Sequence, residues 1–366
     1  MVPAAHSTAG LFLKHAACRI NGSRVFFMVI RQSRRYNADM KKDAKTRIVV
    51  IGGGTGIFAV LVGLKKYFHN LTAIVTMADE GGSTGILREE FGILPPGDIR
   101  RALLALSREE NKILFELFNY RFREGKSLSG HSFGNLMITA LERLTGSFEK
   151  AVGEAAKMLG TQGDVLPVTL RQTRLWAELE NRQIIRGETN IDIPRHDGRV
   201  RIKRAWLSPP VIINPRAEKA ILRADIVVIG PGDLYTSLIP NILVRGVKPA
   251  FKKTRAKVVY LVNLMTKLGE TSGFRASDFL KVMERYVGKN VIDYVVVSSK
   301  RPKPNRLRPY AQEESFWVKL DRENFPSSRR RGNKRGPMLV IGNLVRPRGF
   351  IRHDSEKTAK LIWSLV

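Results

Sequence analysis

The sequence predicts an α/β protein with a mostly parallel sheet, and three observations carry the prediction. Residues 48–68 read as a buried strand, a glycine-rich turn and an amphipathic helix, because a short apolar run precedes GGGTG and helically spaced apolar residues follow it. Strand and helix patterns alternate again over residues 226–297. Four predicted strands also end in loops rich in glycine or in Asp, Asn and Thr, as expected where a parallel sheet binds a ligand.

Length and composition limit the domain organisation. The chain has 366 residues and 43% hydrophobic content, enough for one large α/β domain or one domain with an insertion. The single cysteine, Cys18, leaves no role for disulfides and fits a reducing, cytoplasmic compartment. No apolar run approaches the roughly 20 residues that span a bilayer, so we expect no membrane insertion.

The formal charge of +30 suggests nucleic acid, an anionic surface or a phosphorylated ligand. However, the basic residues crowd into the N-terminal arm and into residues 300–335, with no zinc spacing or nucleic-acid-binding motif. We therefore expect solvated charged segments rather than a nucleic-acid partner, and an exposed basic loop at about 327–336.

Residues 1–44 differ from the rest, since no acidic residue precedes Asp39 while basic residues are frequent. This composition is typical of a transit peptide. It also fits an upstream start assignment, with translation beginning at Met28 or Met40. On either interpretation the arm is disordered or not genuine, and the folded domain is expected to span residues 45–366.

The glycine turn at 52–56 places backbone N–H groups beside the positive end of a helix, which is a site for phosphate. Its spacing is not that of a P-loop, and a tight turn without ligand is the alternative. After the next predicted strand (71–76), Asp79 could bind a ribose, hold a cation or cap the turn. Asp98 is expected to be the N-cap of a helix whose first turn carries Arg100, a candidate phosphate contact.

Later segments supply further candidates. The sequence GHSFGN at 130–135 opens a helix, so that His131 and Asn135 could donate to a ligand, although His131 could equally be a cap. Residues 165–206 read as a small antiparallel excursion that covers the ligand. Helices are expected to begin after Asn214, which is followed by proline, and after Asp354. Polar loops follow the predicted strands that end at about 229 and 262.

With these residues collected, the chain resembles the YvcK/CofD-like family, also called the gluconeogenesis factor family, and the YvcK branch in particular. Its matching stretches include REEFGILPPGDIR (88–100), GHSFGNL (130–136), GPGDLYTSLIPNILV (230–244), NLMTKLGET (263–271) and IRHDSEK (351–357). They follow the family's order across residues 45–366. The resemblance implies a three-layer, Rossmann-like fold with helices on both faces of the sheet and a nucleotide over the strand ends.

The resemblance also implies a function. The YvcK branch binds UDP-N-acetylglucosamine and acts in gluconeogenic growth, cell shape and peptidoglycan supply, with no established reaction. The related CofD branch transfers phospholactate from a guanosine diphosphate donor, and this chain lacks that branch's Ala-Lys glycine turn. Departures from the pattern occur at Glu80, Ile86 and Lys267-Leu268, where the family has Asp, Arg and Gln-Pro. The family's ligand-binding tyrosine and arginine match Tyr310 and Arg352.

The predicted binding residues come from these loops and matches: Gly53, Gly54, Thr55, Gly56, Asp79, Gly81, Gly82, Ser83, Asp98, Arg100, His131, Asn135, Gly230, Pro231, Gly232, Tyr235, Thr236, Asn241, Asn263, Thr266, Glu270, Thr271, Tyr310 and Arg352. No catalytic residue, metal ligand or required cofactor is predicted. Mg²⁺ belongs to the alternative, a CofD-type transfer from a nucleotide diphosphate donor. We further expect regulatory protein partners and a homo-oligomer.

Overall fold

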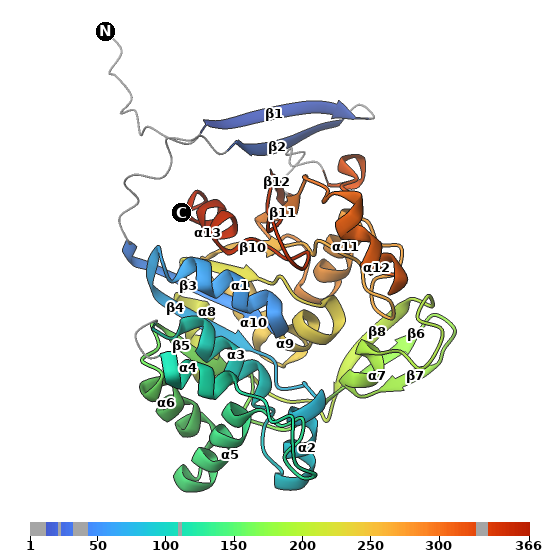
Figure 1. The fold of residues 1–366 in the computed structure, drawn as a ribbon. Coiled ribbons are helices and arrows are strands. Elements are labelled where there is room, and N and C mark those ends of the chain that lie inside the picture. Colours follow the sequence, from blue (N-terminus) through green and yellow to red (C-terminus); the bar gives the residue numbers. More distant parts are fainter. Residues whose placement is uncertain (1–11, 21–22, 32–42, 109–111, 327–335) are drawn as a thin grey trace.

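A nine-stranded sheet runs through the molecule in the order β1-β2-β12-β11-β10-β9-β3-β4-β5 (Figure 1). The computed structural model describes residues 43–108, 112–326 and 336–366, and the backbone of 12–20 and 23–31. All neighbouring strands pair in parallel except β1 and β2, which form an antiparallel hairpin. The strands are β1 (Phe12–Ile20), β2 (Ser23–Arg31), β3 (Asp43–Gly52), β4 (Phe68–Val75), β5 (Asp164–Pro167), β9 (Ile226–Ile229), β10 (Lys257–Leu261), β11 (Tyr294–Ser298) and β12 (Met338–Gly342).

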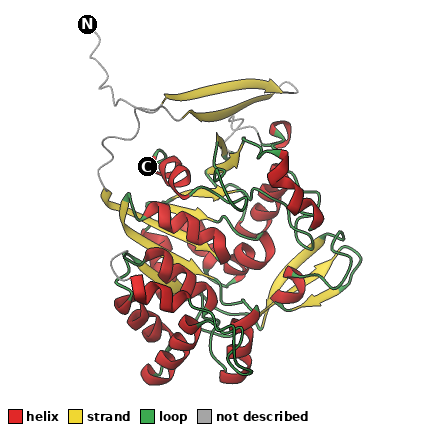
Figure 2. Ribbon diagram, viewed as in Figure 1, coloured by secondary structure: helices red, strands yellow, loops and turns green. Residues whose placement is uncertain are grey.

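Helices cover both faces of the sheet, which confirms the predicted three-layer α/β architecture (Figure 2). Along β3, Ile48 and Val50 enter one hydrophobic core while Val49 and Ile51 enter the other, because strand side chains alternate between faces. The Ile48 face packs against α1 (Gly54–Leu64), α3 (Gly97–Leu106), α4 (Lys112–Asn119), α5 (Phe133–Thr145), α6 (Phe148–Met158) and α13 (Ser355–Trp363). The Val49 face packs against α8 (Pro215–Arg223), η2 (Leu234–Leu238), α9 (Ile239–Leu243), α10 (Val247–Lys253) and α11 (Ala276–Val287).

The strand order reverses between β3 and β9. From β3 the chain proceeds through β4 to β5 on one side, and from β9 through β10 and β11 to β12 on the other. Such a reversal leaves a crevice at the carboxyl ends of the strands, where open parallel sheets bind ligands. The four polar loops noted in the sequence follow β4, β3, β9 and β10, which are neighbours in the sheet.

A separate antiparallel sheet of three strands has the order β7-β6-β8, with β6 (Arg174–Leu179), β7 (Ile184–Arg186) and β8 (Ile202–Ser208). The short helix α7 (Glu188–Asp192) follows β7. The predicted excursion at 165–206 is therefore correct in kind but begins too early. Residues 164–167 form β5, which pairs in parallel with β4 at the edge of the main sheet. Three more elements complete the list: α2 (Gly82–Phe91), α12 (Pro304–Gln312) and η3 (Arg322–Asn324).

The N-cap residues predicted from the sequence can be compared with the residues at which the helices begin. Asn214 Oδ1 accepts a hydrogen bond from Arg216 N at 2.9 Å, and Asp354 Oδ1 accepts one from Lys357 N at 2.9 Å, so both predicted N-caps are confirmed. The prediction for Asp98 is wrong, because α3 begins at Gly97 and Asp98 lies in its first turn. The Asp98 carboxylate instead reaches across to the glycine turn after β3.

The N-terminal arm, from which no strand was predicted, contributes the β1–β2 hairpin. β2 pairs in parallel with β12 and so extends the sheet past that strand. Residues 1–11 and 32–42, and positions 327–335 of the predicted basic loop, lie outside the described residues. Within the described ranges, no helix combines the length and the apolar character needed to cross a bilayer.

Candidate functional site

A cleft of about 700 Å³ opens at the carboxyl ends of β3, β9 and β10, at the point where the strand order reverses. The turns after these strands form one side of it. The α7–β8 connection, the segment around α12 and the segment before α13 form the rest. It is lined by Gly53, Gly54, Thr55, Gly56, Ala59, Asp192, Ile193, Pro194, Pro231, Gly232, Asp233, Ser237, Asn263, Leu264, Met265, Thr266, Lys267, Leu268, Tyr310, Glu313, Ser315, Ile351, Arg352 and His353.

The glycine turn after β3 presents part of its backbone to this cleft. Gly54 N donates a hydrogen bond to Asp98 Oδ1 at 2.9 Å, so this amide already has a partner inside the protein. Thr55 and Gly56 line the cleft in the first turn of α1, where amide groups have no acceptor within the helix. These two N–H groups, at the positive end of α1, are the ones suited to bind an anion.

The turn after β9 packs directly on the first. A Cβ atom added to Gly56 would lie 2.1 Å from the carbonyl oxygen of Pro231, so only glycine permits this approach. Pro231 and Gly232 line the cleft, but Gly230 does not. The Gly230 amide donates a hydrogen bond to Ile51 O at 2.8 Å. The Asn241 side chain donates to Gly52 O at 3.3 Å and to Ser237 O at 2.8 Å, so it links the segments after β3 and β9. Asn241 does not line the cleft.

One side of the cleft is charged. The Lys267 ammonium lies 2.8 Å from Asp233 Oδ2 and 3.5 Å from Glu270 Oε1, and it also donates to Asp192 Oδ1. Burial alone would lower the pKa of Lys267, but Glu270, Asp233 and Asp192 outweigh burial and raise it above its ordinary value. Lys267 is therefore charged at neutral pH. For the carboxyl group of Glu270 burial has the opposite effect, and it raises the pKa to about 7.

The predicted residues Tyr235, Thr236, Glu270 and Thr271 do not line the cleft themselves. Glu270 Oε2 accepts hydrogen bonds from Tyr235 N at 2.7 Å and Thr236 N at 3.3 Å, and Oε1 accepts one from Thr236 Oγ1 at 2.9 Å. Thr271 Oγ1 accepts one from Lys267 N at 2.9 Å. These side chains hold the loops after β9 and β10 in place.

Another part of the cleft brings together the two residues matched at the C-terminal end. The Tyr310 hydroxyl accepts a hydrogen bond from Ile351 N at 2.7 Å, which places it beside Arg352. The Arg352 guanidinium is exposed and stacks on Phe350, with 5.5 Å between the guanidinium carbon and the ring centroid. Burial lowers the pKa of His353 to about 4, so this residue is neutral at pH 7. Arg352 and Lys267 are therefore the two cationic side chains among the lining residues.

Asn263 and Thr266 also line the cleft, beyond the end of β10. The Thr266 hydroxyl accepts a hydrogen bond from Phe316 N at 2.8 Å, and its amide donates to Phe316 O at 2.7 Å. Thr266 thus ties the segment after α12 to the β10 loop. Asn263 Oδ1 is buried and has no hydrogen-bond partner among the residues that the structure describes.

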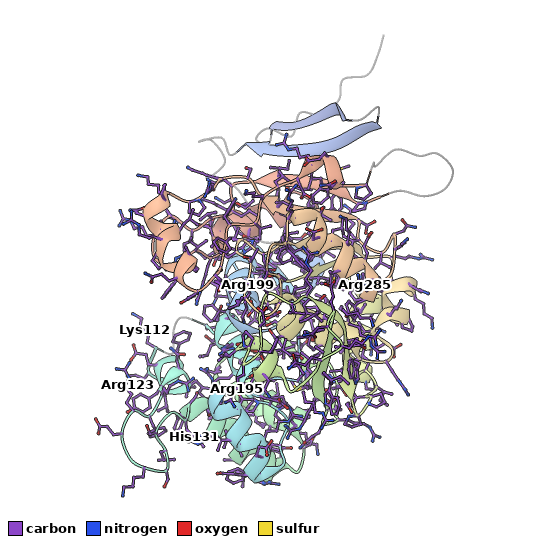
Figure 3. All side chains as sticks on the ribbon, turned by 90° about the vertical axis from the view of Figure 1, so that its right-hand side faces the viewer. Lys112, Arg123, His131, Arg195, Arg199 and Arg285 are labelled. Atoms are coloured by element: carbon purple, nitrogen blue, oxygen red, sulfur yellow. The ribbon has the colours of Figure 1, made fainter. Side chains whose placement is uncertain are left out.

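A second group of predicted residues forms a buried network elsewhere. The Ser83 hydroxyl lies 3.2 Å from His131 Nδ1 and accepts from Asn135 Nδ2 at 3.3 Å, and Asn135 Oδ1 accepts from Arg100 Nε at 3.0 Å. Burial lowers the pKa of Arg100 to about 10. Figure 3 shows His131 near the lower end of the molecule, below Lys112 and Arg123, and Arg199 higher and nearer its middle. The network does not line the cleft, and it joins α2, α3 and α5.

Acidic residues lie between these two groups. Asp79 Oδ1 accepts from Gly81 N at 3.0 Å, and Gly82 lines a separate hollow of about 500 Å³ beside α2. Burial and the nearby Asp79 raise the pKa of Asp98 to about 6. Burial, with Asp79 and Asp192 close by, raises the pKa of Glu188 to about 9, so that this carboxyl group is protonated at neutral pH. Asp79, Gly81 and Gly82 do not line the cleft.

The cleft also contains residues that were not predicted to bind: Asp192, Asp233, Ser237, Lys267 and His353. Asp233 and Ser237 belong to the recognised GPGDLYTS stretch, so proximity to Gly232 was a usable signal. Lys267 stood out only as a departure from a family pattern. Nothing in the sequence indicated that Asp192 would line the cleft, because it lies at the end of α7, beside the small sheet.

Comparison with known proteins places the chain in a family. Residues 48–334 match the family described as "2-phospho-L-lactate transferase CofD". The chain belongs to the CofD family. A "Putative gluconeogenesis factor" from Nostoc sp. is 47% identical over 86% of this chain and 68% of its own length. A "Gluconeogenesis factor" from Listeria monocytogenes is 44% identical over 89% of this chain and 98% of its own length.

A solved structure supports the same assignment. The crystal structure of protein BH3568 from Bacillus halodurans superposes with a TM-score of 0.80 at 37% sequence identity. It covers 88% of this chain and 100% of that one. This member of the CofD family therefore shares its fold with a solved relative over nearly all of the described residues.

Proposed function

We propose that this CofD-family chain binds UDP-N-acetylglucosamine, or a related nucleotide sugar, in the cleft between β3, β9 and β10. The observation that carries the proposal is the meeting of two glycine turns and one exposed arginine around a single cleft. A volume of about 700 Å³ is in the range of about 300–1,000 Å³ that small-molecule sites occupy.

Each part of the cleft suits a part of such a ligand. The free first-turn amides of Thr55 and Gly56 would donate to diphosphate oxygens, and the positive end of α1 would favour their charge. Arg352, which lines the same cleft, would bind the same charge through its guanidinium group. Asn263 Oδ1 offers an unused acceptor for a ligand N–H or hydroxyl.

We further propose a regulatory role rather than catalysis. The relatives in Nostoc and Listeria are named as gluconeogenesis factors, a name that describes a role in carbon metabolism and not a reaction. A protein that responds to UDP-N-acetylglucosamine would link carbon supply to peptidoglycan synthesis and cell shape. It would act through regulatory protein partners in the cytoplasm.

Calorimetric titration tests the proposal. The full chain should bind UDP-N-acetylglucosamine saturably, and Arg352→Ala should weaken binding by about 10- to 100-fold, because a hydrogen bond to a charged group is worth about 1.5–3 kcal/mol. Arg348→Ala is the matched control, since Arg348 is exposed in the same segment but does not line the cleft. Equal affinity of both variants, or no binding by the wild type, would overturn the proposal.

The matched family is described as a 2-phospho-L-lactate transferase, and this description favours one alternative, a CofD-type transferase. For that alternative we propose a nucleotide diphosphate donor and Mg²⁺. In that case GDP should bind more tightly than the UDP-sugar, and Mg²⁺ should strengthen its binding. Titrations with GDP and UDP, each with and without Mg²⁺, therefore separate the two functions.

A further inference from the structure

The charged wall of the cleft has the layout of a cation site. Oxygen atoms of Asp192, Asp233 and Glu270 all lie within 4.8 Å of one another, and Glu270 is buried. Carboxylate oxygens at such spacing are suited to bind a divalent metal ion. Here a cation is already present, because the Lys267 ammonium contacts all three carboxylates.

The ammonium group matches this set of partners. It carries three N–H donors, and each can point at one of the three acidic side chains. The backbone fixes its position, since Lys267 N donates to Thr271 Oγ1 at 2.9 Å and Lys267 O accepts from Thr271 N at 2.8 Å. This turn brings Glu270 back onto its own lysine, three residues earlier in the chain.

The three carboxylates come from separate parts of the chain. Asp192 ends α7, Asp233 precedes η2, and Glu270 follows β10. Lys267 therefore joins the small-sheet insertion to the strand ends of the main sheet. It does so while lining the same cleft as the glycine turns.

We propose that the Lys267 ammonium is the built-in cation of this site. It takes the place that a divalent metal would occupy between Asp192, Asp233 and Glu270, so that a nucleotide diphosphate binds in the cleft without metal. The identity of the ligand rests on the proposed function, but the position of the cation does not. Lys267 is thus a positioning residue that offsets part of the negative charge of the three carboxylates and orders the loops around the ligand.

Manganese binding to the nucleotide-free protein tests the proposal directly. By electron paramagnetic resonance, wild-type protein should bind no Mn²⁺ in the micromolar range. Lys267→Met, which keeps the side-chain length and removes the charge, should bind one Mn²⁺, and adding Asp233→Asn should weaken that site by at least about tenfold. Lys157→Met is the matched control, since Lys157 is an exposed residue of α6 that, within the described part of the chain, forms an ion pair with Glu154 alone. It should behave as wild type.

Two results would overturn the proposal: saturable Mn²⁺ binding by wild type that Asp233→Asn removes, or a folded Lys267→Met protein that binds no more Mn²⁺ than wild type. The wild type supplies a second test in case the variant does not fold. Its affinity for UDP-N-acetylglucosamine should change by less than about twofold between EDTA and millimolar Mg²⁺. A clear gain in this affinity with Mg²⁺ would contradict the role of Lys267. If the wild type binds no nucleotide at all, only the proposed function is contradicted, and the Mn²⁺ comparison decides the role of Lys267.

Discussion

The contact between the two glycine turns makes a sharp prediction for Gly56→Ala. The new Cβ would lie 2.1 Å from the carbonyl oxygen and 2.6 Å from the carbonyl carbon of Pro231. A close carbon–oxygen contact is about 3.3 Å, so the turns after β3 and β9 would have to separate by about 1.2 Å. Both atoms are backbone, and neither can rotate away as a side chain would.

The expected cost follows from this clash. Overpacking costs about 1–3 kcal/mol, and the upper end applies where backbone meets backbone. Alanine returns about 1 kcal/mol because it is the better helix former. We therefore expect the free energy of unfolding to fall by about 2 kcal/mol, measured by urea titration followed by circular dichroism.

Gly153→Ala is the matched control for this substitution. Gly153 lies inside α6, and apart from its chain neighbours and the helix backbone no atom of the described residues is within 4 Å of the Cβ position. The same change there should raise the free energy of unfolding by about 0.5–1 kcal/mol. If Gly56→Ala unfolds at the same urea concentration as wild type, or if both variants shift in the same direction, the packing of the two turns is not as described.

Two further predictions concern the predicted residues outside the cleft. Folding favours the protonated form of Asp98, because its pKa is raised to about 6, so its contribution to stability is complete below about pH 4 and is lost as the pH rises through 6. The free energy of unfolding of Asp98→Asn should therefore rise relative to that of wild type between pH 4 and 7. The gain should reach about 3 kcal/mol, at about 1.36 kcal/mol per pKa unit. A difference in unfolding free energy that does not change with pH in paired urea titrations would refute this. Ser83→Ala should lower the free energy of unfolding by about 1–3 kcal/mol, since it leaves the partners of a buried hydroxyl unsatisfied. This variant should still bind UDP-N-acetylglucosamine as wild type does. A loss of affinity without a loss of stability would assign Ser83 to the ligand site.

The sequence predicted the frame of the fold well because its strongest signals are local. The apolar run at 48–51 followed by glycines specifies a buried strand and a turn, and the structure contains both. The beginning of the small sheet was misplaced because residues 164–167, a short segment with two central apolar residues, fit an edge strand of either sheet. Pairing partners distant in the chain decide between these, and periodicity carries no such information.

The candidate site was predicted in part for a related reason. Glycine turns at strand ends reveal themselves by composition, and those after β3 and β9 do meet at the cleft. Polar side chains such as His131 and Asn135 look alike in sequence whether they face a ligand or the protein interior, and here they satisfy one another around Ser83. The role of Lys267 depends on carboxylates from three separate segments, which only the folded chain brings together.

Hydrogen–deuterium exchange with and without UDP-N-acetylglucosamine tests the central claim most directly. The account predicts that saturating ligand slows exchange in the turns at 53–56, 231–233 and 263–267, and leaves residues 130–136 unchanged. Protection confined to residues 83–100 and 130–136 would place the nucleotide in the buried Ser83 network and contradict a ligand site at the β3–β9 crevice.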